Sequence, residues 1–361
     1  MYPPIIGASR LMAEAGWEVT VLSSPSANSE LRMPPHPAIN VHRITERPSY
    51  IVRKPDFLRY MVSAASLALR WRPDVVYASD PLGAAPGMLA ARLAGARLVY
   101  HEHDSPNSQK DLNPVLARAR LCATRAATAV VFPNVERGAQ AQRELDFMPE
   151  KLRIVWNVPR RAELPVPAPA PDVPLILWYH GSITPDRLPT AVVEAVASFG
   201  GRAQLHIAGY EAPGARGYLK RLLDRGAAQG NQPFVRYLGQ ISRHDLLARA
   251  STAHAGLALM PPRSGDINMR AMVGASNKVF DYMAAGLPLI VSDLPDWRST
   301  FVEPGHALAA DPRDAKSLVA ALKTLFENPE LRREMGRRNR ERIAREWNYE
   351  TAFEPVLGAL T

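Results

Sequence analysis

Cysteine is almost absent from this chain, which has Cys122 as its single thiol among 361 residues. One thiol cannot build an internal disulfide framework or a thiolate zinc cluster, so the composition favours a reducing compartment. Long hydrophobic runs are also lacking, because no stretch approaches the roughly 18 uninterrupted apolar residues that a membrane span needs. We therefore expect a cytoplasmic protein, with or without attachment to the inner face of a membrane.

Acidic residues are in the minority, with 35 Asp and Glu against 44 Lys and Arg and a net charge of +9. The excess is larger in the first half of the chain, which predicts an anionic partner, either a membrane surface or an acidic substrate. A basic surface that serves only solubility is the alternative. No recognised nucleic-acid-binding motif accompanies the charge, so we expect no nucleic-acid partner.

The chain does have a repeating pattern of short β-branched runs and longer helical segments, which predicts parallel sheets covered by helices. A proline-dense stretch, ELPVPAPAPDVP, interrupts the pattern, and the pattern then restarts. We predict two doubly wound α/β domains over residues 1–162 and 175–345, a semi-rigid linker over 163–174, and a C-terminal helix over 346–361 that packs back on the first domain. The expected strands are Trp17–Ser23, Val75–Ala78, Arg97–His101, Ala129–Phe132, Arg153–Trp156, Leu175–His180, Gln204–Ala208, Phe234–Tyr237, Gly256–Met260 and Leu289–Ser292.

The N-terminus departs from this plan. A loop over Tyr2–Ser9 and a helix over Arg10–Gly16 are expected there, whereas a doubly wound domain normally places a buried strand before such a loop. We expect that the first strand is missing by truncation, and the alternative is that another segment fills its place. Gly7 lies in the expected loop, where a glycine permits close backbone approach to a phosphate or an acceptor; an ordinary turn glycine is the alternative.

Residues 276–293, SNKVFDYMAAGLPLIVSD, read as a short helix that begins at Ser276, ends at Gly286 and leads into a strand. The first N–H groups of a helix lack internal partners and carry the positive end of its dipole, so they can bind an anion. Lys278 adds a positive charge, and Asp281, about one turn further on, offers a carboxylate to hydroxyl groups. Phosphate beside polyol is the chemistry of a nucleotide sugar. An ordinary αβ unit with solvated side chains is the alternative.

Residues 101–106, HEHDSP, directly follow an expected strand, where open α/β sheets bind their ligands. His101 and His103 share one face of the strand, and Asp104 could complete a metal site with them. Further ligands such as Asp80 and His180 are scattered in the sequence, so we expect no metal. A histidine that merely ends a strand is the remaining alternative.

These two segments resemble a known family when they are taken together with LILWYHGSITPDRLPTAVVEA, IVWNVP and FVRYLGQISRHDLLARAS. In this order they are similar to family 4-type retaining glycosyltransferases of group 1. The resemblance implies a GT-B fold, in which two Rossmann-like domains face a cleft. It implies an acceptor-binding N-terminal domain and a C-terminal domain that binds a nucleotide-diphosphate sugar, UDP- or GDP-linked. The acceptor would be a glycan or a lipid-linked saccharide, the configuration would be retained, and neither a metal nor a cofactor would be needed.

The resemblance also implies roles for single residues. Arg187 stands where a cation contacts the donor diphosphate, Lys278 and Asn277 lie at the helix start, and Asp281 stands where a glutamate binds the ribose. His103 would face the donor sugar, and we predict His103 and Asp104 as catalytic residues. The full set of predicted donor-binding residues is Gly7, Gly181, Ser182, Arg187, Gly239, Ile241, Asn277, Lys278 and Asp281, with the base near Gly239–Ile241.

Two departures from the family pattern leave alternatives open. Ser182 occupies a position that is often a second arginine. The family's other glutamate, eight positions before Asp281, is Val273 here, and Asp266 or Asn268 are the candidate substitutes. The alternatives are therefore a non-transferase GT-B enzyme, such as a nucleotide-sugar epimerase, or a catalytically silent donor-binding homologue.

The segment RPSYIVRKPDFLRYMVSAASLALRWRP, residues 47–73, combines basic and aromatic residues on an amphipathic stretch. Such a helix can lie on an anionic membrane and deliver a lipid-linked acceptor, so we expect peripheral membrane contact through Arg53, Lys54 and Arg59. A helix whose apolar face packs in the core is the alternative.

Overall fold

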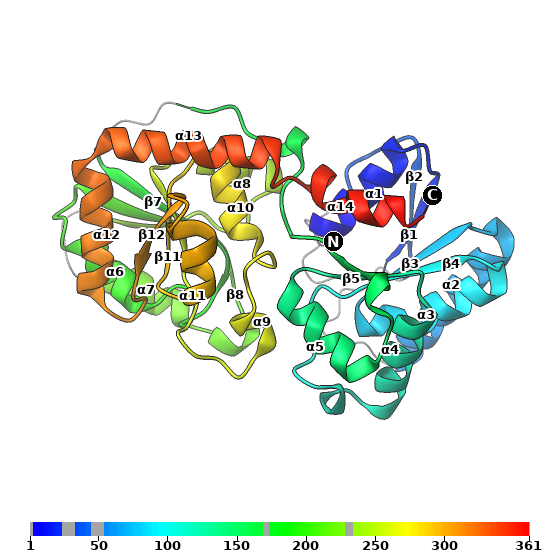
Figure 1. The fold of residues 1–361 in the computed structure, drawn as a ribbon. Helices are drawn as coiled ribbons and strands as arrows, with labels where there is room; N and C mark the ends of the chain where they lie inside the picture. Colours follow the sequence, from blue (N-terminus) through cyan, green and yellow to red (C-terminus); the bar gives the residue numbers. More distant parts are fainter. Residues whose placement is uncertain (1–2, 24–32, 45–53, 169–172, 228–233, 361) are drawn as a thin grey trace. The chain divides into compact units, whose positions relative to one another are not determined.

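The computed structural model describes residues 3–23, 33–44, 54–168, 173–227 and 234–360, and it divides into two compact units (Figure 1). Unit 1 consists of Met1–Asn157, Gly265–Ala275 and Tyr349–Thr361, and unit 2 of Val158–Ser264 and Ser276–Asn348. This division differs from the predicted one, because the described part of the expected linker, residues 163–168, belongs to unit 2. The physical reason lies in hydrogen bonds: Asn157 donates from its backbone to the Gly274 oxygen (2.7 Å) and from its side chain to the Ala275 oxygen (2.8 Å). The chain therefore leaves unit 1 directly after residue 157.

Unit 1 contains a four-stranded parallel sheet in the order β3-β4-β5-β6 and a two-stranded parallel sheet, β1-β2. Strand β5 is wholly buried, and α2, α3, α4 and α5 pack side by side, whereas α14 contacts α1 and β6. The elements are α1 (Pro3–Glu14), β1 (Val19–Ser23), β2 (Ile39–Arg43), α2 (Lys54–Trp71), β3 (Val75–Ser79), α3 (Asp80–Ala94), β4 (Arg97–His101), η1 (Gln109–Asp111), α4 (Pro114–Ala126), β5 (Ala129–Phe132), α5 (Val135–Leu145), η2 (Pro149–Lys151), β6 (Leu152–Ile154), α9 (Ile267–Arg270) and α14 (Tyr349–Gly358).

The predicted loop over Tyr2–Ser9 is wrong, because α1 is helical from Pro3 onward. Prolines at the start of a helix fit its first turn, where the missing N–H groups would have no partner. Gly7 is buried in the middle of α1, and a Cβ atom there would lie 2.7 Å from Cδ1 of Tyr349 in α14. The glycine thus allows α14 to pack closely against α1, and the Tyr349 hydroxyl donates to the Pro4 oxygen (2.9 Å). Its backbone lies inside the helix rather than in a phosphate-binding loop.

Unit 2 is a single six-stranded parallel sheet in the order β12-β11-β10-β7-β8-β9. Helices α6, α7 and α12 pack together in one layer, and α8 and α13 contact α10 in another (Figure 1). Its elements are η3 (Arg161–Glu163), β7 (Leu175–Ile183), α6 (Thr190–Ala197), β8 (Ala203–Glu211), η4 (Pro213–Ala215), α7 (Tyr218–Ala227), β9 (Val235–Tyr237), α8 (Arg243–Ala250), β10 (Ala255–Ala258), α10 (Asn277–Ala284), β11 (Leu289–Ser292), α11 (Pro295–Trp297), the π-helical turn η5 (Arg298–Val302), β12 (Ala307–Ala310), α12 (Ala315–Glu327) and α13 (Pro329–Arg345).

The predicted strands are present, with ends shifted by a few residues, but the sequence did not reveal β2 and β12. Four of the five residues of β2 are exposed, so it lacks the apolar run of a buried strand. Strand β12 is an alanine-rich edge strand, and alanine has a low strand preference. No helix among the described residues is both long and apolar enough to cross a bilayer.

Candidate functional site

The order of strands in unit 2 reverses between β7 and β10, because β7, β8 and β9 run to one side and the chain then returns to β10 on the other. Open α/β sheets bind ligands at the carboxyl ends of their strands at such a switch point. Two of the predicted donor-binding residues, Gly181 and Ser182, lie at the end of β7. Helix α10 packs against β10 and begins with Asn277 and Lys278. The fold therefore brings this part of the predicted donor site together within one unit.

Lys278 is buried directly beside the end of β7, with 7% of its surface exposed. Its Nζ donates to the Tyr179 hydroxyl (3.1 Å) and lies 4.7 Å from the centre of that ring. Gly181 has a φ of 108°, and a Cβ atom there would lie 2.7 Å from Cε of Lys278. A side chain at position 181 would therefore displace the lysine, which explains the glycine.

A second cation lies near the first. Nη1 of Arg187 donates to Oγ of Ser182 (2.8 Å), so the arginine reaches back to the end of β7. Burial lowers the pKa of Lys278 well below its ordinary value, and the positive charge of Arg187 lowers it further. In the described part of the chain no carboxylate forms an ion pair with Lys278. The N-cap residue of α10, Ser276, makes no side-chain capping bond to the helix start. This arrangement favours an anion.

Asp281 is buried, with 2% exposure, and its carboxylate already has protein partners. Arg243 binds both oxygens, with Nη2 3.0 Å from Oδ1 and Nη1 3.1 Å from Oδ2. Nε2 of His180 lies 3.2 Å from Oδ2. Because the Trp178 indole can only donate, to His180 Nδ1 (3.0 Å), the proton of His180 is on Nε2 and is donated to Asp281.

The charge of Asp281 is held by these partners. Burial acts to raise the pKa of Asp281, but the Arg243 charge and the hydrogen bonds from His180 and Arg243 keep it below its ordinary value. Arg243 also pairs with Glu163, so one arginine joins two carboxylates. The ribose role predicted for Asp281 would require a hydroxyl to share this occupied carboxylate.

The predicted base-binding turn lies after β9. Gly239 has a φ of 75°, and its oxygen accepts from the Gly209 N–H (2.8 Å), which ties the turn to the end of β8. Gly239 and Ile241 are half-buried. No contact in the described residues distinguishes this turn as a base site, and its role stays a prediction.

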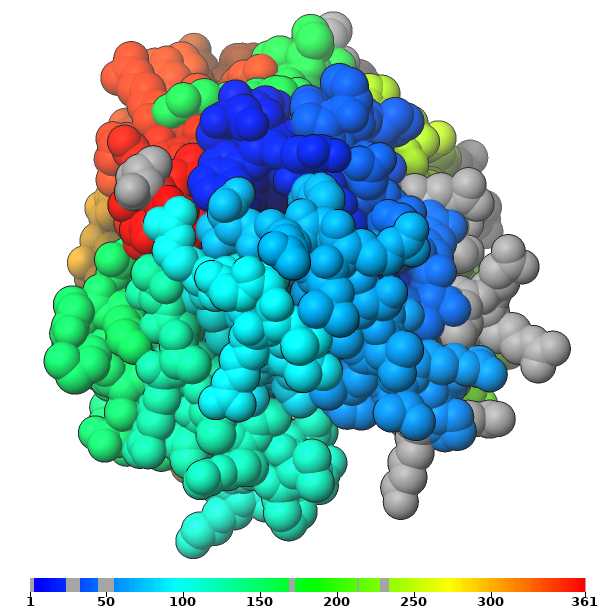
Figure 2. All heavy atoms as spheres, turned by 90° about the vertical axis from the view of Figure 1, so that its right-hand side faces the viewer, coloured from blue at the N-terminus to red at the C-terminus, as the bar shows by residue number. Residues whose placement is uncertain are grey.

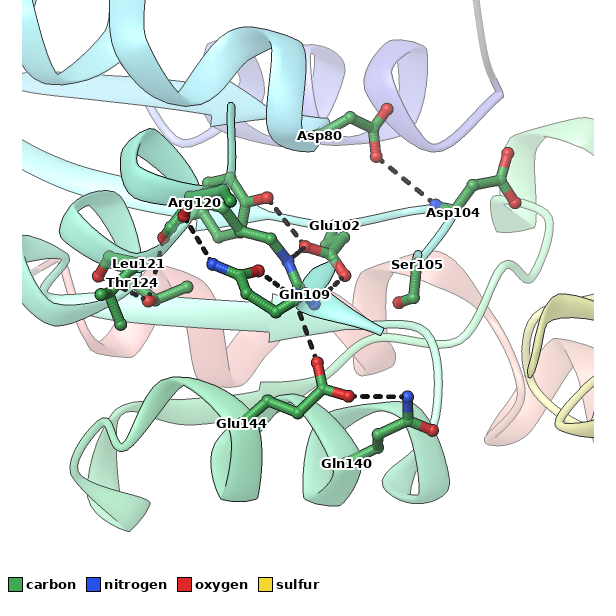
Figure 3. Close-up of polar contacts among 12 residues, drawn as sticks. Asp80, Glu102, Asp104, Ser105, Gln109, Arg120, Leu121, Thr124, Gln140 and Glu144 are labelled. Carbon is green, nitrogen blue, oxygen red and sulfur yellow. Dashed lines mark hydrogen bonds and ion pairs between the residues drawn. The ribbon is translucent and has the colours of Figure 1, made fainter. Parts of the chain in front are cut away.

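In unit 1 the predicted catalytic residues follow β4, beside the end of β3. Figure 3 shows one of them, Asp104. The His103 ring is 5% exposed and packs on His101, with ring centres 3.8 Å apart. Burial lowers the pKa of His103 to about 4, so the imidazole is neutral near pH 7. Asp104, by contrast, is exposed. Among described residues no group of three or more His, Cys, Asp or Glu has metal-binding geometry.

Asp80 fixes the backbone of this loop. Its Oδ1 accepts the N–H of His103 (2.8 Å) and that of Asp104 (3.4 Å), which Figure 3 shows for Asp104. From the other side, Nη1 of the buried Arg137 donates to the His103 oxygen (2.9 Å). Asp80 and Arg137 were not predicted as binding residues. The place of Asp80, directly after a strand, was the only sequence signal for it.

A buried ion pair supports the same loop one residue earlier (Figure 3). Glu102 is fully buried and binds Arg120 in α4 through two bonds of 2.7 Å. The Tyr100 hydroxyl donates to the same carboxylate (2.8 Å), and Arg120 also donates to Gln109 (2.9 Å). Separating the two partners would leave an uncompensated buried charge, which is strongly unfavourable. The ion pair therefore fixes the position of the loop that carries Glu102.

The candidate substitutes for the missing glutamate serve unit 1 itself. The Asn268 side chain accepts from the Ser105 N–H (2.9 Å) and donates to the Ser105 oxygen (2.8 Å). Asp266 caps α9 by accepting the Asn268 N–H (2.9 Å). The Val273 oxygen accepts from Asn134 (2.9 Å). Neither substitute therefore presents an unengaged side chain to a sugar in this structure.

Comparison with family models gives two matches. A glycosyl transferase 4-like domain matches residues 7–158, and a glycosyl transferase-like model matches residues 190–358. Curated relatives include UDP-N-acetylglucosamine–N-acetylmuramyl-(pentapeptide) pyrophosphoryl-undecaprenol N-acetylglucosamine transferases of Shewanella sp. (strain W3-18-1) and Shewanella putrefaciens, each 29% identical over 150 residues. The match covers 39% of this chain and 41% of each relative. The chain thus spans about two fifths of the length of the curated relatives it matches.

Solved structures resemble the chain over nearly its whole length. Sucrose-phosphate synthase from Thermosynechococcus elongatus matches with a TM-score of 0.71 and 18% identity, covering 98% of this chain and 90% of that one. A glycosyltransferase from Rickettsia africae matches with a TM-score of 0.70 and 13% identity, covering 99% and 93%. Anabaena HepE in complex with UDP-glucose matches with a TM-score of 0.66 and 15% identity, covering 95% and 98%. At these identities the likeness shows the fold.

Proposed function

We propose that this chain, which belongs to the GT4-type group 1 glycosyltransferases and has their GT-B fold, transfers a sugar from a nucleotide-diphosphate sugar to a glycan or lipid-linked saccharide. Unit 2 binds the donor and unit 1 the acceptor. The observation that carries the proposal is the pair of cations, Lys278 and Arg187, at the switch point of the unit 2 sheet.

The diphosphate lies between Lys278, Arg187 and the start of α10. The charged form of Lys278 is unfavourable in the unliganded protein, because burial penalises its charge and Arg187 repels it. A bound diphosphate offsets this unfavourable energy, because it brings negative charge to both cations and to the N–H groups of α10. The cost in the unliganded state thus favours a ligand with more than one negative charge.

The same groups serve the chemistry. When the bond between the sugar and the diphosphate breaks, negative charge grows on the leaving phosphate, and fixed positive groups that already face it lower the barrier. The two side chains supply the charge that a metal ion supplies at other sites, which supports a metal-independent reaction. Retention of configuration and the proton transfer from the acceptor to a phosphate oxygen rest on the family resemblance. We propose UDP as the first base to test, because relatives act on UDP-N-acetylglucosamine and HepE was solved with UDP-glucose.

The acceptor side is proposed for unit 1, at the ends of β3 and β4. His103 is neutral near pH 7, so it contributes hydrogen bonding rather than charge. Helix α2 supplies the contact with an anionic membrane: Leu58, Val62 and Leu69 are exposed at positions that lie within about 40° of each other around the helix axis. Figure 2 shows the surface of unit 1 that α2 helps to form. Arg53 lies outside the described residues, and Arg59 is exposed.

Thermal shift with UDP-, GDP-, ADP- and TDP-sugars tests the donor site. We expect one base to raise the melting temperature of the parent protein, and Lys278→Met to abolish that rise while it keeps the packing against Tyr179. Lys220→Met is the matched control, because Lys220 is exposed in the same unit and pairs only with Asp224. An undiminished shift in Lys278→Met contradicts the phosphate site. Binding without transfer to any acceptor would indicate a silent homologue, and release of sugar and nucleotide without an acceptor requirement would favour an epimerase-type enzyme.

A further inference from the structure

Asp80 lies in the left-handed backbone region, which few non-glycine residues occupy. Its φ is 61°, and it is the first residue of α3, immediately after β3 and before Pro81. This conformation costs a residue with a Cβ atom about 1 kcal/mol, and such strain concentrates at functional sites. The strain places the carboxyl group at the carboxyl end of the sheet, where parallel α/β sheets bind ligands. A glycine could adopt this conformation without the steric cost of a Cβ atom.

The two oxygens of Asp80 have different surroundings. Oδ1 accepts two backbone N–H groups, from His103 and Asp104. Oδ2 accepts no hydrogen bond from any residue that the structure describes, although it belongs to the same carboxylate. In Figure 3 the second oxygen points away from the Asp104 bond. One oxygen is therefore used to hold the loop, and the other is available to a ligand.

A second observation points to a ligand at the same loop. Ser105 is 7% exposed, and its Oγ has no hydrogen-bond partner among the described residues. Nε2 of the fully buried His101 also lacks a partner there. Buried polar groups are normally hydrogen-bonded, because an unmade bond costs about 1–3 kcal/mol. Hydroxyl groups of a saccharide both donate and accept, so they can bind a carboxylate oxygen and a serine hydroxyl of the same loop.

We infer that Oδ2 of Asp80 accepts a hydrogen bond from a hydroxyl group of the acceptor saccharide. The inference rests on the proposed transferase function and adds a specific ligand on the acceptor side. It also gives a reason for a carboxylate at an unfavourable place. Burial, and then the charges of Asp104 and Glu102, raise the pKa of Asp80 to about 7, whereas the hydrogen bonds from the N–H groups of His103 and Asp104 lower it. A carboxylate with this cost and no structural need for Oδ2 is consistent with a group kept for binding.

Three variants separate binding from loop support. Asp80→Asn keeps an oxygen for the two N–H groups but replaces Oδ2 by an N–H₂ donor. Asp80→Ala removes both functions. Asp74→Asn is the control, because Asp74 is an exposed carboxylate at the other end of the same strand. Steady-state kinetics of the full chain, with the donor and the acceptor varied in turn, give kcat/KM for each substrate.

We expect Asp80→Asn to lower kcat/KM for the acceptor by about 10- to 150-fold, as for loss of a hydrogen bond to a charged group, with the donor KM within twofold of the parent. Asp80→Ala should lose more, and Asp74→Asn nothing. If Asp80→Asn keeps full acceptor kcat/KM while Asp80→Ala loses it, Asp80 only supports the loop and the inference is wrong. An equal rise in the donor KM would overturn it as well, because Oδ2 would then contact the donor.

A binding measurement keeps the inference testable if no transfer is found. Saturation-transfer NMR with methyl glycosides of glucose, galactose and N-acetylglucosamine, without any donor, reports binding to the parent protein directly. Signals in the parent and in Asp74→Asn that vanish in Asp80→Asn support the inference. Signals that persist in Asp80→Asn, or no signal in the parent, contradict it. Failure of the proposed function shows itself elsewhere, as absence of nucleotide binding or indifference to Lys278→Met in unit 2.

Discussion

Replacing Asp80 by asparagine should make the protein more stable, and the gain should grow with pH. Asparagine is nearly isosteric and still accepts the N–H groups of His103 and Asp104, so the loop geometry is kept. The variant replaces the charged carboxylate by a neutral amide, and the negative charge is unfavourable in this half-buried place near Asp104 and Glu102. The nearby hydroxyl groups of Tyr77 and Tyr100 have raised pKa values, so they are neutral and do not offset the charge of Asp80.

The magnitude follows from the pKa of Asp80, which the fold raises from 3.8 to about 7. Because the folded pKa is the higher one, the folded state holds the proton more tightly than the unfolded state. The contribution of Asp80 to the stability of the parent is therefore least unfavourable below pH 4, becomes more unfavourable as the pH rises from about 4 to 7, and levels off above pH 7. Each pKa unit corresponds to about 1.4 kcal/mol, so roughly 4 kcal/mol is the upper limit of the cost at high pH.

Partial exposure of Asp80 lowers this limit through solvent screening. We expect the stability gained by Asp80→Asn to be about 1–2 kcal/mol larger at pH 8 than at pH 5. For a unit of this size that difference is roughly 2–8 °C in melting temperature. Thermal unfolding at both pH values, followed by circular dichroism, measures it. Asp74→Asn should shift neither. An equal gain at both pH values, or a loss of stability at pH 8, would refute the reasoning.

Three further predictions concern other parts of the chain. Asp281→Ala should destabilise unit 2 by about 3–5 kcal/mol in urea unfolding, because it leaves the half-buried Arg243 without one of its carboxylates and the buried His180 without its acceptor. Gly7→Ala should cost about 1–3 kcal/mol, since its methyl group would overlap the Tyr349 ring. Replacing Arg53, Lys54 and Arg59 with Glu should weaken sedimentation with anionic vesicles, because basic residues near a membrane contribute about 1 kcal/mol each.

Each of these three predictions has a matched control. Asp224→Ala removes an exposed carboxylate from unit 2 and should cost less than about 1 kcal/mol. Gly358→Ala places a methyl group at a helical glycine with nothing within 4 Å and should be neutral or slightly stabilising. Vesicles of neutral lipid should bind parent and variant alike. A mild Asp281→Ala, a neutral Gly7→Ala or unchanged sedimentation with anionic vesicles would each contradict its prediction.

Much of the fold could be predicted because its signals are local. Buried parallel strands such as Arg97–His101 and Ala129–Phe132 are apolar runs, and the structure places them at these bounds. Strand β2 was not predicted, because an exposed edge strand has no such apolar run. The helix at the N-terminus was misread because Gly7 and two prolines resemble a loop, whereas the need for glycine comes from Tyr349, far away in sequence.

The candidate site was predictable to the extent that helix starts and strand ends are visible in sequence. Lys278 and Gly181 lie together as the pattern indicated. The partners of Asp281 could not be foreseen, because Arg243 and His180 come from separate elements that only the folded sheet brings to it. Asp80 was considered only as a scattered metal ligand, because the two N–H groups that it binds belong to a loop more than twenty residues later.

Calorimetric titration of UDP into the parent, Lys278→Met and Lys220→Met proteins tests the central claim most directly. If the buried Lys278 and the half-buried Arg187 hold the diphosphate, UDP binds to the parent and to Lys220→Met with the same Kd. Lys278→Met should then weaken binding by about 10-fold or more, the loss expected for a hydrogen bond between charged groups. Equal Kd values for all three proteins would contradict the account, because the diphosphate would then lie elsewhere.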